Sequence, residues 1–382
     1  MIDPTLTCKT CGETKPVFHF HQRASSKTGY APSYRVCVNE KRQNTKPSPA
    51  ATRTQLMNVA KKGDLDTMRP SLAGTPPVSL DSLLNACVTP YVSFPKKSTH
   101  PDLARFLITR GADPNARGTQ GEPMLSLAAK SGVPELVQSL LQGGANLDFF
   151  TGASILDASE VERWLRSDPS LATAADHTGL TGLHYCAGSA LGRVSEAYVN
   201  KQLATIGVLL EAGSHPNHEV DQGIAITPLV ACCTSGGVIP VIHRLVDAGA
   251  NANHPNALRS ALRHFKQKRS AQNPVADALI DRGCDVDGLI DADRTCLHAY
   301  SHHEETQAVR WLLERGASVH ARTSDGRTPL HLAADRNNHT SVVKLLLEQG
   351  AEPDATDTLG RKPIDYAQSN DKTKVAALLR TK

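Results

Sequence analysis

The chain has 382 residues, of which 40% are hydrophobic but only 4% aromatic, so its core must be built mainly from Leu, Ala, Val and Ile. The sequence lacks an apolar run of about 18 residues and the start of a secretory signal, which argues against a membrane protein and a secreted one. The net charge is +4, and residues 1–50 hold eight Lys or Arg against three Asp or Glu, a local charge of +5. The basic character therefore belongs to this segment, where it favours an acidic or nucleic-acid contact.

The nine cysteines are scattered along the chain. An odd number without regular spacing argues against a disulfide framework and is typical of a reducing compartment. We therefore expect a cytoplasmic protein. We expect three parts: a small zinc-binding module over residues 1–45, a linker over 46–52 and a repeat array over 53–382.

The N-terminal segment contains a Cys-x-x-Cys pair. Cys8 and Cys11 have the spacing with which two thiolates reach one tetrahedral zinc ion. Residues 5–43 resemble the small zinc module of phage-type HNH and endonuclease VII-like nucleases. In that family the second ligand pair is another Cys-x-x-Cys; here Cys37 fits its second position, while Tyr34 occupies the first, so one ligand is missing.

A fourth zinc ligand is available nearby. His19 and His21 lie on the same side of a strand-like alternation, and either completes a Cys₃His site. Glu40 is an alternative oxygen ligand, and a decayed module without zinc is the remaining alternative. So short a segment hardly folds without metal, which makes structural zinc the expected cofactor. The predicted ligand set is Cys8, Cys11, Cys37 and His21.

The rest of the chain repeats a phrase that ends in glycine. The phrase 346–351, Leu-Leu-Glu-Gln-Gly-Ala, recurs at intervals of 33 to 36 residues, with one double interval that holds a degenerate copy around 164–169. The first half of the unit, Thr-Pro-Leu-His at 328–331, is matched by Thr-Cys-Leu-His at 295–298, Thr-Gly-Leu-His at 181–184 and Thr-Pro-Leu-Val at 227–230. Over roughly residues 52–382 the sequence closely resembles the ankyrin repeat family. That resemblance implies an all-α solenoid of about nine or ten helix-turn-helix repeats.

The physical chemistry of one unit agrees with this interpretation. Thr328 is a good N-cap and Pro329 suits the first helical turn. An apolar stripe from Val342 to Leu347 predicts a second helix, which Gly350 ends because glycine tolerates a left-handed conformation. Two short helices cannot bury both faces alone, so each unit needs its neighbours.

Two units depart from the pattern by long insertions between their helices, within 81–111 and 181–213. The first insertion carries Tyr91 and the second Tyr198. Tolerated loop drift explains such insertions at little energetic cost. As a functional alternative, these exposed aromatics contact a partner.

The sequence contains no convincing catalytic set. His184, His298 and His331 recur at one position of the unit and are expected to bond neighbouring loop backbone. The segment 303–307 begins like a metalloprotease motif, but Gln307 replaces its second histidine. Phosphate-binding, dinucleotide and nucleophile-elbow motifs are absent, so we expect no enzyme and no small-molecule substrate.

The ankyrin resemblance implies that loop tips and the ends of the first helices line one concave face. A face of mixed charge suits a protein partner better than a phosphate backbone. We therefore expect a non-catalytic protein-binding scaffold or inhibitor with no membrane contact. The alternative is an adaptor, as in a phage or bacterial host-interaction protein, that binds DNA or RNA through residues 1–50. The predicted partner-binding residues are Arg117, Gln120, His218, Gln222, Arg294, His302, Asp325, Arg327, Asp335, Arg336, Tyr91 and Tyr198.

The zinc module can be tested by metal content. We expect the purified chain to carry about one zinc ion, since three thiolates and one imidazole fill a tetrahedral site. Elemental analysis measures it. A Cys8→Ser, Cys11→Ser double variant should lose the metal, and retention of the full zinc content would refute the ligand set.

Overall fold

The computed structural model divides into two units, residues 1–56 with 69–77 and residues 57–68 with 78–382. The structure describes residues 5–7, 14–16, 20–22, 30–34, 52–72, 74, 76–89, 100–263, 272–303, 305–336 and 340–381. Within 1–51, only backbone strands are described. Strand β1 (Thr5–Thr7) pairs antiparallel with β2 (Thr14–Pro16), and β3 (Phe20–Gln22) pairs antiparallel with β4 (Tyr30–Tyr34).

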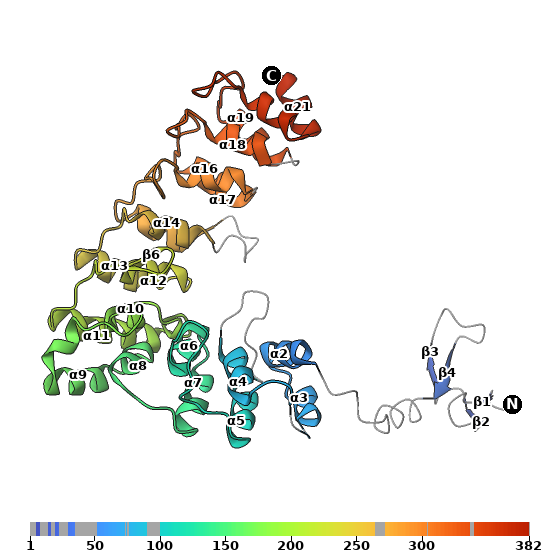
Figure 1. Ribbon diagram of the computed structural model, residues 1–382, viewed down its shortest axis with the longest axis vertical. Coiled ribbons are helices and arrows are strands. Elements are labelled where there is room, and N and C mark those ends of the chain that lie inside the picture. Colours follow the sequence, from blue (N-terminus) through green and yellow to red (C-terminus); the bar gives the residue numbers. More distant parts are fainter. Residues whose placement is uncertain are drawn as a thin grey trace. The chain divides into compact units, whose positions relative to one another are not determined.

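The remaining described residues form ten consecutive helix pairs, which Figure 1 colours in chain order from blue to red. The first five pairs are α2 (Arg53–Lys62) with α3 (Leu65–Ser71), α4 (Leu80–Val88) with α5 (His100–Thr109), α6 (Met124–Ser131) with α7 (Pro134–Gln142), α8 (Phe149–Ser154) with α9 (Ala158–Ser167), and α10 (Gly182–Ala187) with α11 (Glu196–Glu211). The last five are α12 (Pro228–Thr234) with α13 (Ile239–Asp247), α14 (Pro255–Leu262) with α15 (Pro274–Ile280), α16 (Cys296–His302) with α17 (Thr306–Glu314), α18 (Pro329–Arg336) with α19 (Ser341–Glu348), and α20 (Pro363–Ser369) with α21 (Thr373–Arg380).

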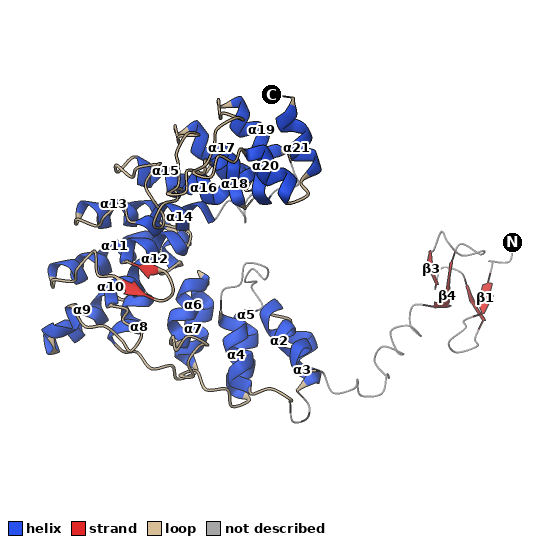
Figure 2. Cartoon of the chain, turned by 45° about the horizontal axis from the view of Figure 1, so that its top comes forward, coloured by secondary structure: helices blue, strands red, loops and turns tan. Residues whose placement is uncertain are grey.

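In the second unit, the first helix of a pair packs against the first helix of the next pair, and the second helix against the second. First helices contact first helices from α4 through α14 and again from α16 through α20, and second helices contact each other in the same way, for example α11 with α13 and α17 with α19. Figure 2 shows these pairs side by side. Tyr300 of α16 links to α14 by donating its hydroxyl to the Arg259 carbonyl at 2.9 Å. The predicted mostly helical repeat solenoid is confirmed.

The core consists of the small aliphatic residues that the composition requires. Leu209, Leu245, Leu312 and Leu346, which occupy one position of the repeating phrase, are all 0% exposed. The glycine that ends the repeating phrase has a positive φ, as at Gly350 with 87°. A residue with a Cβ would be strained there, which explains why the phrase ends in glycine.

A histidine cap joins each of three repeats to the next. His184 Nδ1 accepts a hydrogen bond from the Thr181 backbone N–H at 3.2 Å, and its Nε2 lies 3.2 Å from the Ile226 carbonyl oxygen of the following repeat. A carbonyl can only accept, so the proton resides on Nε2. His298 and His331 bond Thr295 and Thr328, and the carbonyls of the next repeats, in the same way. The structural interpretation of these histidines is confirmed.

The histidine caps form one ladder of hydrogen bonds between repeats, and asparagine side chains form a second. Asn115 Oδ1 accepts from the Asn146 backbone N–H at 2.6 Å, and Asn217 Oδ1 accepts from Asn251 N–H at 2.7 Å. Each acceptor stands four residues after the glycine that ends its repeat. The two ladders fix the connections between repeats, which carry the exposed loop tips.

The interpretation of the 181–213 insertion as a loop was wrong. Residues Leu191–Arg193 form a 3₁₀ turn, η3, and α11 begins at Glu196 and runs for 16 residues. Ser189, Ala190 and Leu191 are almost fully buried. The segment from Glu196 to Ala212 contains no proline and a single glycine, Gly207, so the extra residues lengthen the second helix instead of forming a free loop.

Truncation of a solenoid core residue should destabilise strongly. Leu346→Ala leaves a cavity next to both neighbouring repeats, so we expect a loss of about 2–5 kcal/mol in the free energy of unfolding. Lys344→Ala, at an exposed position of the same helix, is the matched control and should change it by less than about 0.5 kcal/mol. Urea unfolding measures both; equal midpoints would contradict the repeat register.

Stability should fall on mild acidification. Burial lowers the pKa of His184 from 6.5 to about 4, and burial likewise lowers the pKa values of His298 and His331. Below pH 6.5 the unfolded chain therefore binds protons that the folded chain does not. The stabilisation is complete above pH 6.5 and is lost as the pH falls toward 4, by about 3 kcal/mol for His184 alone.

Urea unfolding at pH 7 and pH 5 tests this dependence, and NMR titration of the histidine ring carbons tests its origin. The ring of His184 should stay neutral at pH 5. A fully charged His184 at that pH in the folded protein would rule out the proposed coupling.

Candidate protein-binding surface

Several neighbouring helix pairs are joined by a hairpin-like connection, including one closed by the Thr323 N–H, which donates to the Arg327 carbonyl at 3.0 Å. Strands β5 (Val220–Asp221) and β6 (Ala225–Ile226) form one such hairpin, and single antiparallel bridges close the equivalent connections at Arg117 with Pro123, Ala175 with Thr181, and Leu289 with Thr295. Directly after each hairpin comes a first helix. We call the surface made by these hairpins and the first helices the hairpin face.

The connection between α7 and α8 is an exception because it comprises only residues 143–148. With no hairpin there, the tip of 117–123 lies against the tip of 175–181. A Cβ at Gly121 would lie only 2.5 Å from His177 Nε2, and φ of this glycine is 83°. Glycine thus allows two hairpins from non-adjacent repeats to touch.

This contact brings two predicted site residues together. Gln120 and Gln222 line one polar hollow of about 280 Å³ with Glu122 and Thr178. Both glutamines are exposed, although they lie on different hairpins. The hollow therefore offers amide, hydroxyl and carboxylate groups to an incoming chain.

A second, mainly apolar cavity of about 140 Å³ opens beside it, between α10, α12 and the β5–β6 hairpin. This cavity was not expected from the sequence. Its walls include Leu180, Tyr185, Ile224, Ile226 and Ala231. The signal that could have found it is the pair of isoleucines just before the capping Thr227, where most hairpins of the chain are polar.

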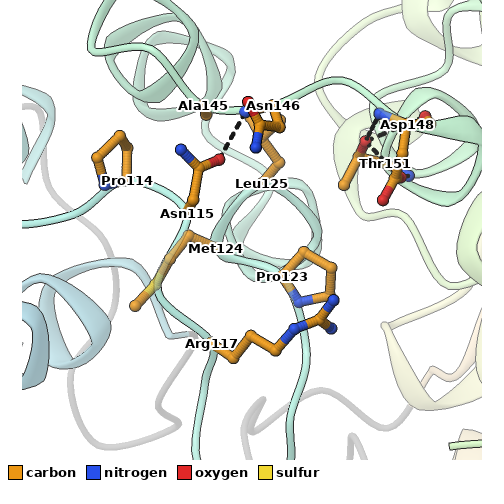
Figure 3. A pocket seen from close by; sticks show the side chains of 10 residues that line it. All are labelled: Pro114, Asn115, Arg117, Pro123, Met124, Leu125, Ala145, Asn146, Asp148 and Thr151. Atoms are coloured by element: carbon orange, nitrogen blue, oxygen red, sulfur yellow. Dashed lines mark hydrogen bonds between the residues drawn. The ribbon is translucent and has the colours of Figure 1, made fainter. Parts of the chain in front are cut away.

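Arg117 borders a third, small hollow of about 100 Å³ between the 117–123 hairpin and the start of α8. Figure 3 shows Arg117 beside Pro123, with the Asn115 to Asn146 hydrogen bond across the hollow. Arg117 Nη1 donates to the Gly121 carbonyl at 2.8 Å. Its guanidinium thus holds its own hairpin in shape.

Two other predicted arginines are paired within their own hairpins. Arg294 pairs with Asp291 at 2.6 Å, and Arg327 pairs with Asp325 at 2.6 Å. Partial burial raises the pKa of Asp291, but hydrogen bonds from Arg294 outweigh this and hold it below its usual value. Asp325 behaves alike through Thr323 and Arg327. The Asp325 carboxylate therefore helps to hold its own hairpin in shape.

Three predicted residues meet near the carboxyl ends of neighbouring first helices. Arg336 Nε donates to His302 Nε2 at 3.1 Å, and Asp335 Oδ1 accepts from the Asn370 amide at 2.7 Å. Burial, followed by the nearby His303 and Arg336, lowers the pKa of His302. The imidazole is therefore a neutral acceptor for the guanidinium.

His218 contacts a capping histidine, and Tyr198 lies on a second helix. His218 packs edge-on against His184, with ring centroids 5.7 Å apart, and so supports the histidine ladder. Tyr198 is half-buried on α11, a second helix, with the Lys201 ammonium 5.2 Å from its ring centroid. It therefore lies on a different element from the other predicted residues.

Several predicted residues fall outside the described part of the chain. These are Tyr91, Cys8, Cys11 and Cys37, while His21 lies in β3 without a described side chain. Elsewhere, the described residues contain no group of three or more His, Cys, Asp or Glu arranged to hold a metal ion. None of the described helices is long and apolar enough to span a membrane.

Parts of this chain are similar to known proteins. A family model described as ankyrin repeats matches residues 267–357 and 296–382. E3 ubiquitin-protein ligase KEG of Arabidopsis thaliana is 26% identical over 247 residues, which cover 60% of this chain but 15% of that protein. The human ASB11 ankyrin repeat domain aligns with 61% of this chain and 98% of its own length, at 21% identity and a TM-score of 0.45. The C-terminal part of the chain, residues 267–382, thus contains ankyrin repeats, in continuity with the helix pairs that precede it.

Proposed function

We propose that this chain is a non-catalytic scaffold that binds a protein partner through the hairpin face, which corresponds to the concave face expected from the sequence. The observation that carries the proposal is the pair of adjoining hollows, one polar and one apolar, which share Gln222. Protein interfaces combine apolar pockets for anchoring side chains with a polar rim in this way.

The charges of the hairpin face favour a protein over a nucleic acid. Arg294 and Arg327 have carboxylate partners, and the Lys130 ammonium forms an ion pair with Glu122. A phosphate backbone requires uncompensated cations whose counterions are released on binding. Compensated pairs instead give a mixed surface that selects a complementary protein.

A second proposal concerns residues 1–50, where the local charge of +5 favours contact with DNA or RNA and the cysteine spacing favours zinc. It rests on the sequence alone. Nucleic-acid binding through this segment should weaken steeply as salt increases, whereas protein binding through the hairpin face should depend on salt only weakly.

Alanine variants test the main proposal once affinity purification from the native cell has supplied a partner. Arg294→Ala, Arg327→Ala, Arg336→Ala, Tyr91→Ala and Tyr198→Ala remove residue types in which interface energy concentrates. At least one of the four changes other than Tyr198→Ala should weaken partner affinity by more than about 1 kcal/mol, because Tyr198 lies on the second helix α11 and not on the hairpin face.

The matched controls are Lys344→Ala and Glu348→Ala, two exposed positions on the second helix α19. Calorimetric titration should give unchanged affinity for both. If only the controls weakened binding, the partner would lie on the second-helix side and the proposal would be wrong.

A further inference from the structure

We propose that the apolar cavity between α10, α12 and the β5–β6 hairpin binds one phenyl-sized aromatic side chain of a partner polypeptide. The inference rests on the proposed protein-binding function and specifies the chemistry of its anchoring residue. Figure 2 shows the two short strands beside α10 and α12, the elements that bound the cavity.

The size of the cavity matches one aromatic ring. Its volume is about 140 Å³, and apolar cavities of about 150 Å³ bind benzene. Leu180 and Tyr185 form buried walls, while Ile224, Ile226 and Ala231 remain partly exposed at the opening. A ring that enters from solvent would therefore cover apolar surface that now contacts water.

The walls are held in place before any ligand binds. The Tyr185 hydroxyl donates to Asp176 Oδ2 at 2.7 Å, so its ring cannot turn away. His184, a further wall residue, bonds the Ile226 carbonyl and so ties the hairpin to α10. Preformed walls reduce the ordering cost of binding.

The rim selects a neutral occupant. Among the described residues, Lys130 is the one cation on the cavity wall, and its ammonium is engaged by Glu122 of the neighbouring hollow. The Ser235 hydroxyl, also on the cavity wall, donates a hydrogen bond to the Gly188 carbonyl at 2.5 Å. A charged side chain would lose its hydration without gaining an uncompensated partner, whereas an aromatic ring has no such cost.

The adjoining hollow indicates that the ring belongs to a polypeptide. Gln222 lines both spaces, and its exposed side chain can bond the main chain of a segment whose ring fills the apolar cavity. The next residues of that segment would meet Gln120, Glu122 and Thr178. A peptide with an aromatic residue followed by polar residues fits both hollows.

Model amides test the cavity on the full-length protein without a known partner. N-acetyl-phenylalaninamide should shift the isoleucine methyl NMR signals of Ile224 and Ile226 in a saturable manner. N-acetyl-alaninamide and N-acetyl-lysinamide should bind at least tenfold more weakly. Equal affinities for the three amides would overturn the proposal.

Cavity-filling variants locate the binding. Ala231→Phe places a ring inside the cavity and should weaken the phenylalanine amide at least tenfold, while Ala197→Phe, at an exposed position of α11, should leave it unchanged. Should Ala231→Phe fail to fold, Ile224→Ala on the hairpin removes one wall and should weaken binding several-fold. Unchanged affinity in the folded variant would refute the assignment.

The outcome separates this inference from the proposed function. If Arg294, Arg327 or Arg336 variants weaken a partner that Ala231→Phe leaves unaffected, the scaffold proposal stands and the aromatic anchor is refuted. If the amide binds the cavity while no hairpin-face variant affects the partner, the scaffold proposal fails instead.

Discussion

The array depends on an imidazole that serves two repeats at once. His184 closes the first turn of α10 through Thr181 and bonds the Ile226 carbonyl of the next repeat. Both ring nitrogens are occupied, so the ring must stay neutral, and burial keeps its pKa low. The same bond sets the position of the hairpin whose Ile226 side chain lines the apolar cavity. Stability and the candidate site thus rest on one contact.

Charged side chains of the hairpins form their hydrogen bonds and ion pairs within their own hairpins. Asp176 accepts from Tyr185 and from two backbone amides of its own hairpin, and Arg117, Arg294 and Arg327 each bond within theirs. These bonds keep the tips ordered, and carboxylates compensate the charges of Arg294 and Arg327. What distinguishes one part of the face from another is therefore shape and hydrophobicity, which is why the adjoining hollows carry the functional argument.

The sequence predicted the features that depend on contacts between near neighbours and that recur from unit to unit. The glycine that ends the repeating phrase and the Thr-x-x-His cap act within a few residues, so the period alone identifies their roles. The cavity was not predictable because Lys130 and Ile224 come together only through stacking and through the short 143–148 connection. The long unit between Thr181 and Gly213 indicated a loop at Tyr198, but the helix-forming residues before Gly213 extend α11 over this position. Gln120 and Gln222 are 102 residues apart in the sequence, and only the fold brings them to one hollow.

The short connection between α7 and α8 also bears on how such an array can change over evolution. Repeat proteins gain and lose length by whole units. Here the Gly121 tip touches His177 across a repeat that contributes no hairpin of its own. Duplicating or deleting a unit between them would separate Gln120 from Gln222. An insertion or deletion between the 117–123 hairpin and α12 would therefore disrupt the two hollows, whereas a change in repeat number beyond α12 would leave their lining residues in place.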